Sequence, residues 1–463
     1  MTDLIRVIDG NELDPFAAIS ERTVQRDSET EQIVSAILAD VKAHGDAALV
    51  ENAQRFDCPA LVDIETPRAE IESATIEPRF DQAIQLAAAQ INFFHTGQLL
   101  VLTAGMARTD ATGPIQQVWQ GGERPSYTWD SIRATQFAGE ESAPFSEGSR
   151  GQRYLPLDRV GVYVPGGKAT YPSSVLMNAI PAMVAGVREV IVASPADRTG
   201  THPASVQVAI RQAGVRRAFR VGGAAAIAAM AYGTESVPKV DKIVGPGNRW
   251  VNEAKRQVWG AVGLDGYAGP SEVCVVVDDS ANPKFAAADL LTQVEHAPDN
   301  AAFLIATTRD ALENVLRQIE KQLAGAPRES TMRAALRDNS IAILAFSGTE
   351  AIELVNFIAP EHLTLSVKEP HRWLEHIHHA GCVLLGDWTP ESAGDYCLGA
   401  SHTLPTAGAA RWQSPVNVLD FLKVQSVSHL NREVLEFWKP VIEAFGEMEG
   451  FPAHAGGATI RFE

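Results

Sequence analysis

The fold class is indicated first by one stretch of sequence, Val160-Gly161-Val162-Tyr163-Val164-Pro165-Gly166-Gly167. In it a short apolar segment ends in a glycine turn. Helical periodicity follows it from Pro172 to Ala185. The same order recurs three more times, with strands predicted at 189–193, 217–221 and 242–244 and helices at 203–213, 224–232 and 250–258. This repetition is typical of a parallel sheet with crossover helices, which binds ligands beyond the carboxyl ends of its strands.

Glycine turns follow three of these strands, at Pro165-Gly166-Gly167, Gly222-Gly223 and Gly245-Pro246-Gly247-Asn248. Such turns let backbone N–H groups and a helix N-terminus approach a phosphate. None has the GxGxxG spacing of the ordinary dinucleotide fingerprint, and any one of them could simply shape a tight turn. Three in one sheet favour a nucleotide-sized ligand.

A second α/β unit is predicted downstream, between residues 271 and 390. Its strands are expected at 273–277, 302–307, 341–345 and 380–385, and its helices at 312–323, 333–336 and 350–357. The N-terminal part is expected to be helical at 28–55 and 69–96, with a capping box from Ser28 to Glu31. Residues 97–153 are irregular but contain Trp119 and Trp129, and after Arg411 only a helix at 431–448 is expected.

Composition narrows the class of protein. The chain has 463 residues and a net charge of -18, which argues against a broad nucleic-acid or anionic-membrane surface. No apolar run approaches the ~20 residues of a membrane span, and no signal peptide is apparent. Its 4 cysteines form no CxxC pair, so neither a disulfide framework nor a thiolate zinc site is indicated. We expect a reduced, cytoplasmic protein.

Gln293 and His296 are the first candidates for chemistry, in a segment predicted to be helical from Ala286. Three residues apart on a helix, both side chains leave the same face and could form half of a metal shell. Two ligands do not complete a zinc site, and a single histidine is more often structural. Further donors lie downstream, in Glu361-His362, Asp395, His402, Glu449 and His454.

Glu361 and His362 follow Pro360, which favours a turn or the first residue of a helix. An adjacent acid and imidazole suit proton transfer, although a pair of solvated loop residues is an equally common explanation. Asp395 could join a metal shell or cap a turn. A cluster of His376, His378 and His379 is interpreted as the solvated face of a helix.

Long, ordered motifs make the chain resemble the histidinol dehydrogenase family. They are VGVYVPGG (160–167), PSSVLMNAIPA (172–182), TESVPKVDKIVGPGN (234–248), NEAKRQV (252–258), AGPSEV (268–273), ADLLTQVEH (288–296), APEHL (359–363), LLGDWTPESAGDY (384–396), SHTLPT (401–406) and AHAGGA (453–458). The N-terminal helices match more loosely.

The resemblance implies an α/β fold with two incomplete, Rossmann-like parallel-sheet domains, N-terminal helices and an extended C-terminal tail that crosses to a partner subunit. Residues 1–155 with 268–410 would form the catalytic domain, 156–267 the NAD-binding domain, and 411–463 the swapped tail of a homodimer with shared active sites. The implied activity is the zinc- and NAD-dependent, four-electron oxidation of L-histidinol to L-histidine through L-histidinaldehyde, the last step of histidine biosynthesis.

The resemblance also assigns roles to residues. Glu361 and His362 would be the acid–base pair. Zinc would be held by Gln293, His296, Asp395 and His454, the last from the partner subunit. The substrate would touch these ligands and Ser271, His362, His402 and Glu449, and NAD would be held at Tyr163, Ala225 and Asn248.

Two positions depart from the family pattern. Ala225 stands where Gln usually contacts the cofactor, and Ser401 stands where Asn is usual. They leave open a paralogue that oxidises another small polar alcohol, such as a sulfonated diol. A non-catalytic zinc- or nucleotide-binding module is the third alternative, and the intact ligands and acid–base residues disfavour it.

Overall fold

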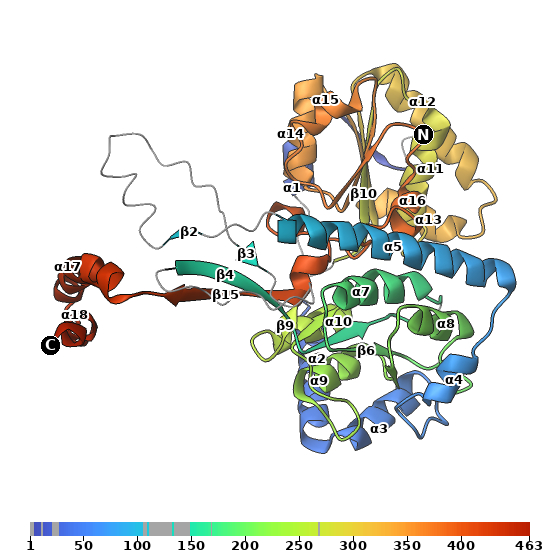
Figure 1. Ribbon diagram of the computed structural model, residues 1–463. Coiled ribbons are helices and arrows are strands. Elements are labelled where there is room, and N and C mark those ends of the chain that lie inside the picture. The colour runs from blue at the N-terminus through green and yellow to red at the C-terminus, as the bar shows by residue number, and fades with distance from the viewer. Residues whose placement is uncertain are drawn as a thin grey trace. The chain divides into compact units, whose positions relative to one another are not determined.

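The computed structural model describes residues 4–10, 13–20, 27–104, 109–110, 132–133, 149–167, 169–266 and 269–463. The chain forms two compact units (Figure 1). One comprises Met1–His95 with Leu157–Phe421, and the other Thr96–Pro156 with Leu422–Glu463. Trp119, Trp129 and most of the irregular stretch between 97 and 153 lie outside the described residues, so the predictions made for those residues are not tested. The irregular structure predicted for 97–104 is wrong, because a helix extends to Ala104.

A five-stranded parallel sheet in the first unit confirms the repeated strand–turn–helix pattern. Its order is β7-β6-β5-β8-β9, so the strand order reverses between β5 and β8. The strands are β5 (Arg159–Tyr163), β6 (Glu189–Ser194), β7 (Arg217–Arg220), β8 (Lys242–Val244) and β9 (Gly263–Leu264). The helices are α7 (Pro172–Val184), α8 (Ala204–Gln212), α9 (Gly223–Tyr232) and α10 (Arg249–Val258). Ligands favour the carboxyl ends of strands at such a reversal.

A six-stranded parallel sheet, β1-β12-β11-β10-β13-β14, forms the predicted second α/β part of the same unit. Its strands are β1 (Arg6–Asp9), β10 (Glu272–Val277), β11 (Ala301–Ala306), β12 (Ile341–Leu344), β13 (His362–Ser366) and β14 (Cys382–Leu385). Its helices are α11 (Pro283–Val294), α12 (Arg309–Leu323), α13 (Glu329–Asn339), α14 (Gly348–Ile358), α15 (Pro370–Leu374) and α16 (Glu391–Tyr396). Separate apolar clusters bury its two faces.

Two sequence predictions about this second part are wrong, and one strand was missed. His362 does not sit in a turn or a helix, because it begins β13, a central strand. Helix α15 ends at Leu374, so the cluster of His376, His378 and His379 is not on a helix face. Strand β1, which pairs with β12, was not predicted.

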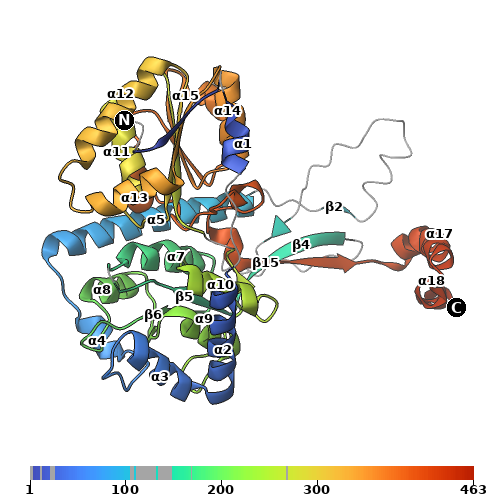
Figure 2. The ribbon, with the colours of Figure 1, turned by 180° about the vertical axis from the view of Figure 1, so that it is seen from behind.

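The N-terminal helices are α1 (Pro15–Ser20), α2 (Ser28–His44), α3 (Asp46–Phe56), α4 (Arg68–Ser73) and α5 (Pro78–Ala104). Helix α2 packs against α9 and α10, as Figure 2 shows. Its cap is Asp27, whose carboxylate accepts a hydrogen bond from Glu29 N–H, so the predicted Ser28 capping box is wrong. The helical opening itself is confirmed.

The second unit contains β2 (Thr109–Asp110), β3 (Ile132–Arg133), β4 (Ser149–Pro156) and β15 (Leu422–His429), in which β4 and β15 pair antiparallel. Helices α17 (Arg432–Met448) and α18 (Pro452–Thr459) follow and pack on each other. The predicted helix at 431–448 is therefore confirmed, whereas β15 was not predicted. Among the described residues, no helix combines the length and apolar composition needed to cross a bilayer.

Candidate active site

The turns at the carboxyl edge of the five-stranded sheet lie very close together. A Cβ on Gly245, whose φ is +120°, would lie 2.1 Å from the carbonyl oxygen of Tyr163. A Cβ on Gly166 would lie 2.5 Å from Pro195 Cγ. Glycine is therefore required for the turns after β5 and β8 to approach their neighbours.

The three predicted cofactor residues all occur at the starts or ends of elements on this edge. Tyr163 ends β5, is buried, and its hydroxyl accepts a hydrogen bond of 3.2 Å from Gly223 N–H at the start of α9. Ala225 is buried in the first turn of α9. Asn248 caps α10, where its Oδ1 accepts hydrogen bonds from Trp250 N–H and Val251 N–H.

A buried ion pair, not anticipated from the sequence, fixes the turn after β8. Lys255 Nζ lies 2.7 Å from Asp265 Oδ1 and 2.6 Å from the carbonyl oxygen of Gly245. Asp265 Oδ2 accepts a hydrogen bond of 2.7 Å from Gly245 N–H. Lys255 is only 2% exposed, which is rare for an unpaired lysine. The sequence signal for this burial was the position of the lysine on the side of α10 that otherwise faces inward.

The predicted catalytic residues gather at the amino edge of the six-stranded sheet. His362 Nδ1 lies 2.8 Å from the Gln293 amide, in the last turn of α11, and His362 Nε2 lies 3.5 Å from Asp395 Oδ1, on α16. All three side chains are buried. The site therefore lies at the edge opposite to the one that parallel sheets ordinarily use.

Charges around His362 determine its protonation. Burial alone would lower the pKa of the imidazole, but Glu391, Asp395 and Glu361 outweigh it and raise the pKa to about 10. Burial opposes ionisation of Asp395, yet the imidazole of His362, with His402 and His296, keeps the pKa of Asp395 below its ordinary value. His362 and Asp395 therefore form an ion pair.

Glu361 is a buried acid next to this ion pair. Its Oε2 accepts a hydrogen bond of 2.8 Å from Glu272 N–H and lies 4.0 Å from His362 Nδ1. Burial raises the pKa of Glu361 to about 8, which keeps the carboxyl protonated at neutral pH. A buried acid and an adjacent imidazole, both with raised pKa values, can exchange protons with a bound substrate.

Glu391 is a second buried acid, and sequence reasoning missed it. It is 0% exposed, and its Oε1 lies 3.5 Å from His362 Nδ1. Neither carboxylate oxygen has a hydrogen-bond partner among the described residues, and burial raises the pKa of Glu391 well above its ordinary value. The only sequence signal was its position four residues before Asp395, within one of the quoted motifs.

His296 differs from the sequence prediction. Helix α11 ends at Val294, so His296 is exposed in the following turn and does not share a helix face with Gln293. Its Nδ1 lies 3.3 Å from the carbonyl oxygen of Gln293, and its charge acts on Asp395. Among the described residues, no three His, Cys, Asp or Glu side chains are grouped so as to hold a metal ion.

The remaining predicted residues lie as follows. His402 is part-buried, with Nδ1 3.1 Å from the carbonyl oxygen of Asp395, and burial lowers the pKa of its imidazole. Ser271 directly precedes β10. Glu449 and His454 belong to the second unit, where both are exposed, at the end of α17 and on α18. The structure thus brings together Gln293, Glu361, His362, Asp395 and His402.

Known proteins match nearly the whole chain. A family model described as Histidinol dehydrogenase matches residues 20–121 and 132–462. The histidinol dehydrogenase of Dechloromonas aromatica is 42% identical over 443 residues, which is 95% of this chain and 94% of that one. The enzyme of Geobacter sulfurreducens is 42% identical and covers 97% of both chains. The crystal structure of histidinol dehydrogenase from Elizabethkingia anophelis has a TM-score of 0.86 and 32% identity, over 99% of this chain and 98% of that one.

Proposed function

Because this chain belongs to the histidinol dehydrogenase family and is therefore an oxidoreductase, we propose that it oxidises L-histidinol to L-histidine with two molecules of NAD+ and a bound zinc ion. L-histidinaldehyde would be the intermediate, and the reaction would end histidine biosynthesis. The observation that carries this proposal is the buried Glu361–His362 pair beside Gln293 and Asp395.

His362 is proposed to accept the hydroxyl proton of histidinol as hydride leaves its carbon for NAD+. The imidazole must be neutral to do this, and Asp395 would hold the imidazole proton less strongly if its carboxylate bound a cation. The products of this step are the aldehyde, NADH and one proton.

Glu361 is proposed to act in the second half of the reaction. As a carboxylate it removes a proton from water, which adds to the aldehyde carbon and gives a hydrate. The hydrate transfers a second hydride to NAD+ and becomes the carboxylic acid. A pKa of about 8 suits a base that works near neutral pH, because it gains and loses its proton there.

The proposed zinc ligands are Gln293, His296 and Asp395, together with His454 of the partner subunit. Their nitrogen and oxygen donors suit zinc, and the first and third flank one imidazole ring in the structure. Bound zinc is redox-inert and supplies a Lewis acid that orients the substrate. The substrate pocket is proposed to contain these ligands together with Ser271, His362 and His402. Glu449 of the partner subunit is proposed to complete it.

NAD is proposed to bind at the strand-order reversal of the five-stranded sheet, where Tyr163, Ala225 and Asn248 lie. The glycine turns after β5, β7 and β8 support this, because the glycines carry no side chain that would keep a ligand away from the backbone at this edge. We accordingly propose residues 156–267 as the NAD-binding domain and residues 1–155 with 268–410 as the catalytic domain.

A homodimer with shared active sites is proposed, in which residues 411–463 of each subunit reach the other. Exposed apolar side chains support it. On α17, Phe437, Val441 and Phe445 are 52%, 41% and 55% exposed at four-residue spacing. On α5, Leu86 and Phe93 are 65% and 76% exposed. Several exposed large apolar side chains on one helix are typical of surfaces that are covered in an assembly.

The direct experiment is steady-state oxidation of histidinol by the purified protein. We expect two NADH per histidinol, loss of turnover with a chelator, and recovery when zinc is returned. No NADH from histidinol in the zinc-loaded protein would contradict the proposal.

A paralogous activity on another small polar alcohol is the second candidate. It is favoured by Ala225 in the first turn of α9 and by Ser401, which is buried and accepts a hydrogen bond from Thr403 N–H through its hydroxyl. A panel of alcohols, including a sulfonated diol, tested with NAD+ and saturating zinc separates the two candidates. Histidinol as the poorest substrate of the panel would favour the paralogue.

A further inference from the structure

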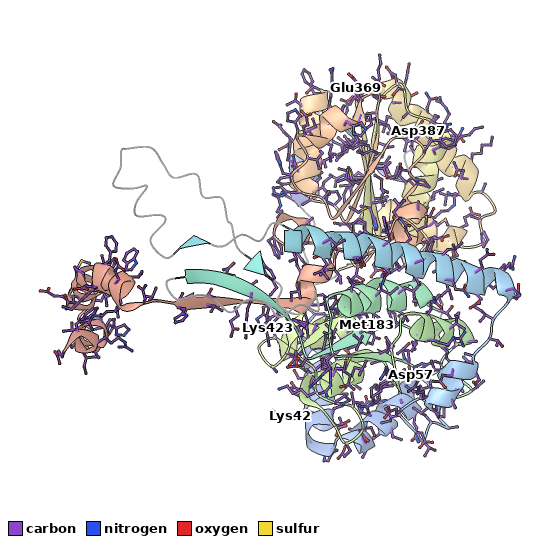
Figure 3. All side chains as sticks on the ribbon, in the orientation of Figure 1. Lys42, Asp57, Met183, Glu369, Asp387 and Lys423 are labelled. Carbon is purple, nitrogen blue, oxygen red and sulfur yellow. The ribbon has the colours of Figure 1, made fainter. Side chains whose placement is uncertain are left out.

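Asp57 is a carboxylate that the proposed chemistry does not use, yet it lies at the proposed cofactor edge. It caps the C-terminus of α3, where its N–H donates to the carbonyl oxygen of Ala53 at 2.9 Å. Its Oδ2 lies 3.2 Å from the position that a Cβ on Gly222 would occupy. Asp57 is labelled in Figure 3, in the part of the molecule that contains the five-stranded sheet.

The segment that carries Asp57 is fixed against the turn after β6. The next residue, Cys58, is buried in a small apolar cluster with Ala53, Leu61 and Ala196. Its thiol lies 3.6 Å from the carbonyl oxygen of Arg198. The Cβ position on Gly222 that lies near Asp57 is also 2.8 Å from Pro195 Cβ. The carboxylate is therefore held where the turns after β6 and β7 meet.

In the described part of the chain, no group donates a hydrogen bond to the Asp57 carboxylate and no cationic side chain pairs with it. The group is half-buried, and burial raises its pKa to about 6. Its charge also acts on Tyr163, the residue that ends β5. A desolvated carboxylate without a donor is unfavourable, so a ligand that supplies donors would satisfy it.

Among the described residues that follow the first strands of this sheet, the other candidate carboxylate is already hydrogen-bonded. In dinucleotide-binding sheets an acid near the end of the second strand accepts hydrogen bonds from the adenosine ribose. Here β6 is the second strand, and Asp197 follows it. Asp197 Oδ1, however, already accepts hydrogen bonds from Thr199 N–H, the Thr199 hydroxyl and Thr201 N–H.

We infer that Asp57 accepts hydrogen bonds from the adenosine-ribose hydroxyls of NAD and discriminates against NADP. A 2′-phosphate would remove one of these donors and place negative charge beside the carboxylate. The specificity-determining acid thus comes from the N-terminal helices and not from the sheet. This inference rests on the proposed function, because it assumes that NAD occupies this edge.

The test compares Asp57→Ala and Asp57→Asn with wild type and with Asp63→Asn, a control at an exposed aspartate nearby. NADH binding is measured by fluorescence without substrate, and kcat/KM is measured for NAD+ and NADP+ with histidinol. For Asp57→Ala we expect NADH affinity and kcat/KM for NAD+ to fall roughly tenfold or more, with kcat at saturating NAD+ retained.

Asp57→Asn keeps an acceptor oxygen but loses the charge, so its ratio of NADP+ to NAD+ efficiency should rise by about tenfold with a smaller loss for NAD+. It should unfold at the same temperature as wild type or higher, which excludes misfolding as the cause. The control should match wild type in all measurements.

Two results would overturn the inference. One is a cofactor ratio that stays within about twofold of wild type in both variants. The other is an equal loss of affinity for NAD+ and NADP+, which would show that Asp57 only shapes the pocket. A wild-type protein that binds no NADH would instead refute the proposed function, so the two failures are distinguishable.

Discussion

Glu361 is the residue on which the second oxidation depends. If its carboxylate activates water, Glu361→Gln blocks hydration of the aldehyde but leaves the first hydride transfer to His362 and NAD+. Steady-state turnover should fall at least about a hundredfold, as loss of a general base implies. In a single turnover the yield should drop from two NADH per site to one.

Glu353→Gln provides the matched control, because Glu353 is an exposed glutamate on α14 in the same unit. It should behave as wild type. A Glu361→Gln protein that still yields two NADH per site at the normal rate would remove Glu361 from the mechanism.

The raised pKa of Glu361 also predicts how stability depends on pH. Its pKa is about 8 in the folded protein against an ordinary value of 4.5, so the folded state retains a proton that the unfolded state releases. The free energy of unfolding is therefore highest below the unfolded pKa and falls as pH rises towards 8.

Urea unfolding of the zinc-free protein at pH 5 and pH 7 tests this sign. Wild type should lose on the order of 2 kcal/mol more than Glu361→Gln over this interval. Titrating groups that do not interact with Glu361 behave alike in both proteins and cancel in the difference. A Glu361→Gln protein that loses as much stability as wild type would show that Glu361 is ionised throughout.

At the level of single residues, the sequence indicated which residues carry the chemistry better than it indicated which residues surround them. Glu361, His362 and Asp395 are recognisable as donors and acids, and the fold brings them together. Glu391 was missed because it matters only through being buried beside His362. That burial depends on the packing of α16. Asp57 was missed because it meets Gly222 only through tertiary structure.

At the level of elements, the turn after β8 is held by the ion pair between Lys255 on α10 and Asp265, which follows β9. Lys255→Met leaves a buried carboxylate without a cation, which costs about 3–5 kcal/mol of folding free energy. Lys255→Met with Asp265→Asn leaves no charge unpaired and should cost less than the single change.

The role of this ion pair is tested by measuring the free energy of unfolding of the two variants, with NADH binding as a second readout. Both should weaken NADH binding, because the carbonyl oxygen of Gly245 loses the Lys255 ammonium as its partner in each variant. A double variant that is less stable than Lys255→Met would contradict the proposed coupling.

Element boundaries separate what periodicity can predict from what it cannot. The four strand–turn–helix units around β5 to β8 were predicted to within about two residues, because glycine turns follow three of the strands and Pro195 follows the fourth. Strand β13 was missed because Pro360 precedes it and it contains only five residues, with His362 first. The end of α11 was missed because no glycine or proline follows Val294 directly.

At the scale of the whole molecule, the proposed metal ligands come from both units of the chain. Gln293 and Asp395 lie in the first unit, whereas Glu449 and His454 lie on exposed helices of the second. In the proposed homodimer, His454 of the partner subunit completes each site. Each active site then needs residues from two chains, and inactive subunits should complement each other.

Subunit mixing between Gln293→Ala and His454→Ala is the most direct test of this account, with histidinol oxidation as the readout. Each variant alone should be inactive, because every site in its homodimer lacks one ligand. After random exchange, half of the dimers are mixed and each has one intact site, so the mixture should regain roughly a quarter of wild-type activity. A mixture that stays inactive although labelled subunits exchange, or a His454→Ala protein with full activity, would contradict the shared zinc site.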